Sequence, residues 1–267
     1  MQATYTDDRK MNKKEFNDAA RNLLESKKSK EGIKDYPILN FSKKDLEKLR
    51  ICVVETLKSS DVVPARGKVY EVSKRIFDIT LASVGALVAV IPVGCFALAI
   101  FLQDGGNPFF VQVRLTKGGK PFRMYKLRSM CIDAEEKFSE VQKANKSDGL
   151  AFKSDKDPRI TPIGRFIRKT SIDELPQLIN VLKGDMSIIG PRPPLPREVV
   201  LYTPEQMNRL LVKGGLACIC QTEGRSDMPF DEWIHTDIEY IKNRSMALDI
   251  KILVKMIIAV IKRKGAE

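Results

Sequence analysis

Two adjacent carboxylates, Asp173 and Glu174, lie between two groups of basic residues in the central part of the chain. Arg165 and Arg168 precede the pair on an expected short helix capped by Thr161, and Arg192 follows it between two prolines. Carboxylates can hold a divalent cation or attack phosphorus, and guanidinium groups bind phosphate oxygens through paired hydrogen bonds. The arrangement therefore predicts a site that handles a phosphate ester.

The helix expected after this dyad leaves two roles open for Asp173. Pro176 fits the first turn of a helix, so the pattern places Asp173 at the N-cap, with a buried stripe on Leu175, Leu178, Ile179 and Leu182. In one interpretation, Asp173 only caps the helix. In the other, the helix N-terminus keeps this carboxylate ionised at pH 7, and it attacks phosphorus without a general base. The arginines favour the second interpretation, because the fixed φ of Pro191 and Pro193 limits the backbone around Arg192.

The composition narrows the class of protein. The chain has 267 residues and a formal net charge of +12, which favours nucleic acid, lipid headgroups or phosphorylated substrates as partners. His235 is the only histidine, and the five cysteines are scattered apart from Cys218 and Cys220. A zinc site, a disulfide framework and any mechanism that needs two histidines are therefore not expected.

Residues 79–102 carry no charge and are long enough to cross the roughly 30 Å core of a bilayer. Pro92 lies near the middle, where it kinks a helix, and basic residues flank both ends. A helix that enters the membrane, bends at Pro92 and returns to the same side satisfies both observations. A straight span and a buried core helix are the alternatives.

The remaining segments predict a mostly helical α+β fold. Residues 107–114 and 121–128 are strand-like and flank a glycine-containing turn, which predicts a β-hairpin. Helices are expected to start at two capping pairs, Asn12 with Glu15 and Ser42 with Asp45. Residues 248–264 predict a helix that lies in the membrane interface or packs on the protein.

Three parts follow from these elements. Residues 1–66 form a polar helical extension, which packs on the surface or docks a protein partner. Residues 67–105 form the re-entrant membrane helix region bent at Pro92. Residues 106–267 form a cytosolic catalytic domain, in which the hairpin and interfacial amphipathic helices surround the active site.

Residues 157–193 resemble the bacterial sugar transferase family, the monotopic phosphoglycosyl transferases that start glycan assembly on polyprenyl phosphate. The similarity extends from Tyr70 to the C-terminus and includes residues 74–78, 125–130 and 133–135, with Gln221 and Arg225. The chain resembles the smaller family members. It departs at residues 213–218, where the family often has Lys-Pro-Gly-Ile-Thr-Gly.

The resemblance implies that Asp173 attacks the β-phosphate of a UDP-sugar, releases UMP and passes the phosphosugar to polyprenyl (undecaprenyl) phosphate. It implies that Mg²⁺ binds near the dyad with Asp173 as a ligand. The role of Glu174 stays open between supporting the metal and transferring a proton. The substrate-binding positions that it implies are Lys126, Arg128, Arg168, Pro191, Arg192, Pro193 and Arg225. The expected location is the cytoplasmic face of the bacterial inner membrane, among membrane lipids.

A membrane-anchored basic protein without enzymatic activity is the alternative, because the charge and the N-terminal helices also fit a binding protein. The sequence shows no nucleic-acid motif and has 7% aromatic residues for base stacking, so no nucleic-acid partner is expected. The sequence predicts neither the identity of the sugar nor the oligomeric state.

Overall fold

The protein is described from a computed structural model, which describes residues 41–65, 67–134, 136–137, 157–223 and 228–261. The helix expected after Asn12 lies outside the described residues, as does Arg225. Within the described ranges the chain is mostly helical, with one antiparallel and one parallel two-stranded sheet. The mostly helical α+β prediction is confirmed at this level.

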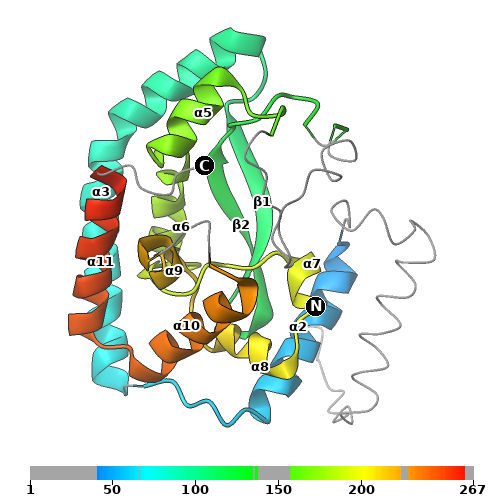
Figure 1. Cartoon of the computed structure of the whole chain (residues 1–267), viewed down its shortest axis with the longest axis vertical. Coiled ribbons are helices and arrows are strands. Elements are labelled where there is room, and N and C mark those ends of the chain that lie inside the picture. The colour runs from blue at the N-terminus through cyan, green and yellow to red at the C-terminus, as the bar shows by residue number, and fades with distance from the viewer. Residues whose placement is uncertain (1–40, 66, 135, 138–156, 224–227, 262–267) are drawn as a thin grey trace, which may run out of the picture.

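The longest element is α3 (Lys68–Asp104), a single helix that contains the charge-free segment and Pro92. It lies along the left edge of Figure 1 and changes direction towards the top. Among the described residues, α3 is the one helix long and apolar enough to cross a membrane. Its side chains Leu87 and Ile91 are 76% and 74% exposed, which does not fit the alternative of a buried core helix.

The predicted hairpin is confirmed. Strand β1 (Phe109–Thr116) pairs antiparallel with β2 (Lys120–Leu127), with Phe109 opposite Leu127. The turn is the 3₁₀ segment η2 (Lys117–Gly119), in which Gly118 and Gly119 have φ values of 67° and 69°. Glycine favours this left-handed conformation because it has no Cβ.

The main core lies where α3 meets α6 (Gln177–Lys183) and the hairpin. Asn180 fixes α6 to β2, because its Nδ2 donates to the oxygen of Arg123 at 2.7 Å and its Oδ1 accepts from the nitrogen of Tyr125 at 3.1 Å. The chain then forms β3 (Ser187–Ile189), which pairs parallel with β4 (Gly215–Ala217). Buried members of this core include Ala82, Met124, Leu178, Val181, Met186 and Ile241.

A second core lies under α2 (Lys43–Lys58). Ser42 and Asp45 form the capping box that the sequence predicted for its start. Val53 packs directly on the hairpin turn, since a Cβ added to Gly119 would lie 2.9 Å from its Cβ. The core also takes in α7 (Pro196–Val199), α8 (Pro204–Met207) and the 3₁₀ segment η5 (Asn208–Leu211). The described part of the N-terminal extension therefore packs on the remainder of the chain.

Three helices complete the described chain: α9 (Ile219–Glu223), α10 (Phe230–Asn243) and α11 (Met246–Ile261). Helix α11 lies alongside α3 (Figure 1). It buries Asp249 and Ile252 and exposes a row of apolar side chains, namely Ile250, Val254, Ile257 and Ile258.

Candidate active site

Helix α5 (Pro162–Lys169) leads the chain into the dyad. The hydroxyl of Thr161 accepts a hydrogen bond from the nitrogen of Gly164 at 2.9 Å, so the predicted N-cap is confirmed. Gly164 approaches the chain after the hairpin so closely that an added Cβ would lie 1.8 Å from the oxygen of Ser129. This contact fixes α5 against the end of the hairpin.

The predicted N-cap role of Asp173 is wrong. Ser171 has a φ of 57°, the one positive value on a described residue other than glycine, and it turns the chain into the 3₁₀ segment η4 (Ile172–Glu174). Helix α6 begins later, with Pro176 at its N-cap. The expected stripe on α6 is also incomplete, since Leu178 is buried but Ile179 is 48% exposed.

The side chain of Asp173 is nevertheless buried, at 7% exposure. Among the described residues it makes no hydrogen bond and no ion pair, so its burial has no capping or ion-pairing explanation. A buried carboxylate without a partner is costly in a fold. Such a group is a candidate for chemistry.

Glu174 has two cationic neighbours from separate parts of the chain. Lys126 on β2 places its Nζ 2.8 Å from Oε1 of Glu174. Arg192 places its Nη1 3.6 Å from the same oxygen. The structure thus brings Asp173 and Glu174 together with Lys126 and Arg192, as the sequence analysis anticipated.

Some neighbours of Asp173 raise the pKa of its carboxyl and others lower it. Burial, and after it the charge of Glu174, raise the pKa of its carboxyl, whereas the charges of Lys126, Arg168 and Arg192 lower it, and the net pKa is about 6. The upward shift is opposite in direction to the one expected from a helix N-terminus. A pKa of about 6 still leaves the carboxyl mainly ionised at pH 7, because the three cations oppose part of the effect of burial and of Glu174.

Two arginines that the sequence analysis missed hold the loop on which Arg192 lies. Arg114 donates to the oxygen of Pro193 at 2.8 Å, and Arg209 donates to the oxygen of Arg192 at 3.3 Å. Arg209 is itself fixed by Asp237 at 2.7 Å, and both side chains are 2% exposed. No local pattern signals these contacts, because each joins residues from separate elements.

The other predicted site residues are placed differently. Arg128 donates through Nη1 to Asp104 at 2.7 Å and through Nε to the oxygen of Asn107 at 2.7 Å, so it joins the hairpin to the end of α3. None of its interactions with described residues involves the dyad. Pro191 and Pro193 flank Arg192 as expected, and Pro191 accepts from the nitrogen of Gly215 at 2.8 Å.

The dyad offers two adjacent carboxylates to a cation. The described residues include no group of three His, Cys, Asp or Glu side chains that could hold a metal. Mg²⁺, however, commonly binds through one or two carboxylates together with substrate phosphates and water. The adjacent carboxylates of Asp173 and Glu174 fit this mode of binding.

Comparison with known proteins gives matches over most of the chain. The family model described as bacterial sugar transferase matches residues 69–263. The galactosyl transferase CpsE of Streptococcus agalactiae serotype III is 42% identical over 224 residues, which cover 80% of this chain and 49% of that protein.

Two further relatives show how the coverage varies. The undecaprenyl-phosphate galactose phosphotransferase of Salmonella typhimurium is 41% identical over 72% of this chain and 41% of its own length. The exopolysaccharide production protein ExoY of Sinorhizobium fredii is 34% identical, with 73% of this chain and 88% of that protein covered. The chain thus spans about half or less of CpsE and the Salmonella protein, and most of ExoY.

Proposed function

Because this chain belongs to the bacterial sugar transferase family, we propose that it moves a sugar 1-phosphate from a UDP-sugar to polyprenyl phosphate and releases UMP. The observation that carries the proposal is the buried, unpaired carboxylate of Asp173 beside Glu174 and its two cations. The name of the Salmonella relative supports undecaprenyl phosphate as the acceptor and a sugar phosphate as the transferred group.

The first step is an attack by a carboxylate oxygen of Asp173 on the phosphorus that bears the sugar. An oxygen–phosphorus bond forms, and the bond from that phosphorus to the bridging oxygen breaks, with its electron pair leaving on UMP. A phosphate oxygen of the acceptor then attacks the same phosphorus. This second displacement restores the carboxylate and yields the polyprenyl diphosphate sugar.

The neighbouring cations support both steps. Lys126 and Arg192 lie next to the carboxylate of Glu174. Arg168 lies close enough to Asp173 for its charge to lower the pKa of that carboxyl. Together they can bind the diphosphate oxygens and stabilise the charge that develops on the leaving phosphate. Glu174 holds Lys126 and Arg192 in position before the substrate arrives.

A cation at the dyad fits the same proposal. Bound Mg²⁺ would neutralise the diphosphate and favour departure of UMP. Asp173 is the proposed protein ligand, and Glu174 lies next to it. Arg128, Pro191, Pro193 and Arg225 remain proposed substrate-binding positions.

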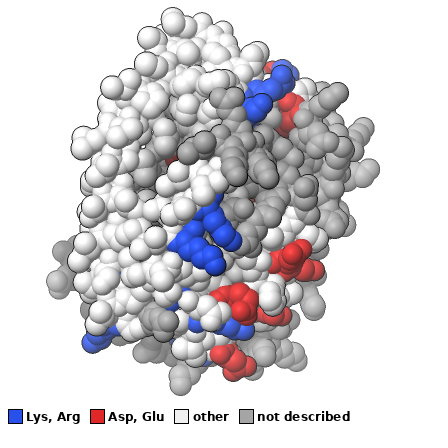
Figure 2. All heavy atoms as spheres, turned by 60° about the vertical axis from the view of Figure 1, so that its left-hand side comes forward, with Lys and Arg blue, Asp and Glu red and all other residues white. Residues whose placement is uncertain are grey.

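We also propose that α3 is a re-entrant membrane helix and that α11 lies in the membrane interface. Both expose long rows of apolar side chains, and both lie on the face that is turned forward in Figure 2. Uncharged side chains cover the upper left of that view. The basic flanks of α3 favour the cytoplasmic face of the inner membrane.

The test is UMP release from a panel of UDP-sugars by detergent-purified protein with Mg²⁺ and polyprenyl phosphate. Wild type, Asp173→Asn and the exposed control Asp231→Asn are compared. We expect release with at least one sugar in wild type and control, and none above background in Asp173→Asn. Full activity of a folded Asp173→Asn protein would overturn the proposal.

A further inference from the structure

A second group of basic side chains surrounds a cavity of about 80 Å³ at the opposite end of α6 from the dyad. The seven residues of α6 separate the two places by about 10 Å of helix. The basic residues that line the cavity are Lys74, Arg75, Lys117, Lys213 and Arg244. Its acidic lining residues are Glu71 and Asp78, so positive charge is in excess.

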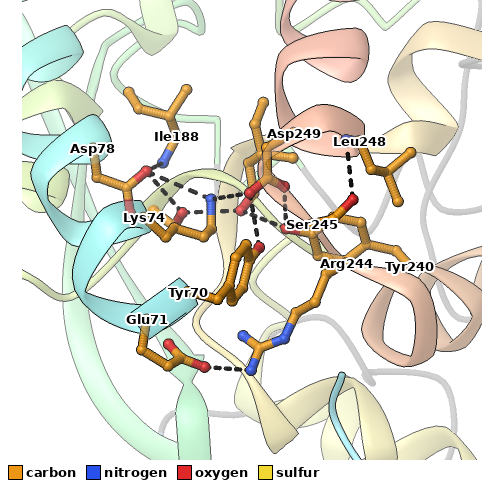
Figure 3. A network of polar contacts seen from close by, with 12 residues as sticks. Tyr70, Glu71, Lys74, Asp78, Ile188, Tyr240, Arg244, Ser245, Leu248 and Asp249 are labelled. Atoms are coloured by element: carbon orange, nitrogen blue, oxygen red, sulfur yellow. Dashed lines mark hydrogen bonds and ion pairs between the residues drawn. The ribbon is translucent and has the colours of Figure 1, made fainter. Parts of the chain in front are cut away.

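Two of these cations already have carboxylate neighbours (Figure 3). Arg244 forms an ion pair with Glu71. Lys74 has its Nζ 3.2 Å from Oδ2 of Asp249 and 3.6 Å from Oδ1 of Asp78.

The other three cations have no carboxylate partner among the described residues. Arg75 donates to the main-chain oxygens of Val181 and Leu182 at 2.7 and 2.8 Å, and these neutral acceptors do not cancel its charge. Lys117 and Lys213 form no ion pair with a described residue. These three cations therefore lack a direct carboxylate partner, although the charges of Asp78 and Glu71 act on Lys213 from a distance.

Two of the cationic nitrogens converge on one point. A Cβ added to Gly184 would lie 3.5 Å from Nη2 of Arg75 and 3.6 Å from Nζ of Lys213. The pKa of Lys213 is lowered by burial and, after that, by the positive charges of Arg75 and Lys117, which outweigh the opposing charges of Asp78 and Glu71. Like charges held this close repel one another, and a bound anion would remove that repulsion.

Lys74 adds a donor from the buried side. Its residue is 6% exposed, and its Nζ makes no hydrogen bond with a described residue despite the two carboxylates nearby. Figure 3 shows this nitrogen directed between Asp78 and Asp249. A buried ammonium with unused hydrogens is costly unless a further acceptor completes its hydrogen bonds.

We propose that this cavity binds a phosphate group, carried by an anionic phospholipid or free in solution. Cationic donors that converge on one point are suited to phosphate oxygens. The cavity is far smaller than the roughly 300–1,000 Å³ typical of sites for larger ligands, so a whole nucleotide sugar does not fit. Val72 and Ile76, on either side of Arg75 along α3, are 60% and 61% exposed and can contact the acyl chains of a lipid.

The first experiment measures thermal unfolding of the full chain in detergent against increasing inorganic phosphate, with chloride used to keep ionic strength constant. Lys213→Gln and Lys117→Gln remove cavity charges without touching the α6 contacts of Arg75. Lys120→Gln removes an exposed charge that does not line the cavity and is the matched control. Phosphate bound at the dyad affects all four proteins alike, so differences among them report on the cavity.

The expected result is that both cavity variants need at least about tenfold more phosphate than wild type or Lys120→Gln for the same rise in Tm. Identical phosphate responses in all four proteins would overturn the proposal. Because two cavity variants are made, failure of one to fold leaves the other as the test.

The second experiment separates the two sources of phosphate. Native mass spectrometry counts lipids retained from mixed micelles of phosphatidylcholine and phosphatidylglycerol. Preferential retention of phosphatidylglycerol by wild type and Lys120→Gln, lost in Lys213→Gln, identifies a lipid headgroup. If wild type and variants retain the two lipids equally but differ in the rise of Tm with phosphate, the ligand is soluble phosphate. If they behave alike in both experiments, the cavity is not a phosphate site.

Discussion

Arg209 donates a hydrogen bond to the main-chain oxygen of Arg192, so one buried arginine holds the backbone of another that faces the dyad. Arg209 is anchored in turn by Asp237 and by the hydroxyl of Tyr202, which accepts from its Nη1 at 2.8 Å. The position of Arg192 is therefore decided by helix α10 and η5, and not only by the two prolines beside it.

Arg209→Met is expected to lower the free energy of unfolding by about 3–5 kcal/mol, because it leaves the Asp237 carboxylate buried and unpaired. Chemical unfolding in detergent measures the loss. The double variant Arg209→Met/Asp237→Leu should recover most of it, since no charge is then left buried. A single variant within about 1 kcal/mol of wild type would contradict this role.

The stability of the same variant should depend more strongly on pH than that of wild type. Burial raises the pKa of Asp237 and Arg209 lowers it, with a net value of about 6, so loss of Arg209 raises the pKa above that value. The folded variant then binds this proton more tightly than the unfolded chain, whose aspartates titrate near 3.9. The stability deficit should be smaller at pH 5 than at pH 8, as measured by unfolding at both values.

Asp173→Asn should lower transfer at least about a thousandfold, because the amide cannot form the acyl phosphate bond. Incubation with a UDP-sugar labelled in the sugar, without acceptor, should leave label on wild type and on Asp231→Asn but not on Asp173→Asn. The variant should also be more stable than wild type at pH 8, since a buried carboxylate is removed. Covalent label on folded Asp173→Asn would refute attack by Asp173.

The pH profile of kcat/KM should show an acid limb near pH 6, because burial and the charge of Glu174 raise the pKa of Asp173 to about 6 against the effect of its cationic neighbours. Below it the carboxyl is protonated and cannot attack, so activity falls about tenfold per pH unit. Glu174→Gln should move the limb to lower pH, since the charge of Glu174 raises the pKa of Asp173. A limb that stays in place in Glu174→Gln would mean that another group controls it.

Gly164→Ala should destabilise the protein by about 2 kcal/mol or more, because the new Cβ would overlap the oxygen of Ser129. Gly94→Ala is the comparison, because a Cβ there meets nothing within 4 Å and alanine favours a helix. Thermal unfolding in the same detergent compares the two. Equal Tm values would show that the contact between α5 and residue 129 does not constrain the fold.

Several elements could be predicted from the sequence because their signals are local. The capping box at Ser42, the cap at Thr161 and the glycine turn of the hairpin all satisfy backbone groups within a few residues. The long apolar helix follows from its composition, and the dyad with Lys126 and Arg192 follows from chemistry and family resemblance.

By itself, then, the sequence determined which residues are the candidates for the chemistry and where most described helices and strands form. Only the tertiary structure decided that Asp173 lies in a 3₁₀ turn and not at a helix cap, and that Arg209 holds Arg192. Only the tertiary structure places Arg75 and Lys213 at the same cavity. The physical reason is that the residues in these arrangements are far apart along the chain. Their burial and their charged neighbours come from other helices and strands, so a local sequence pattern does not predict them.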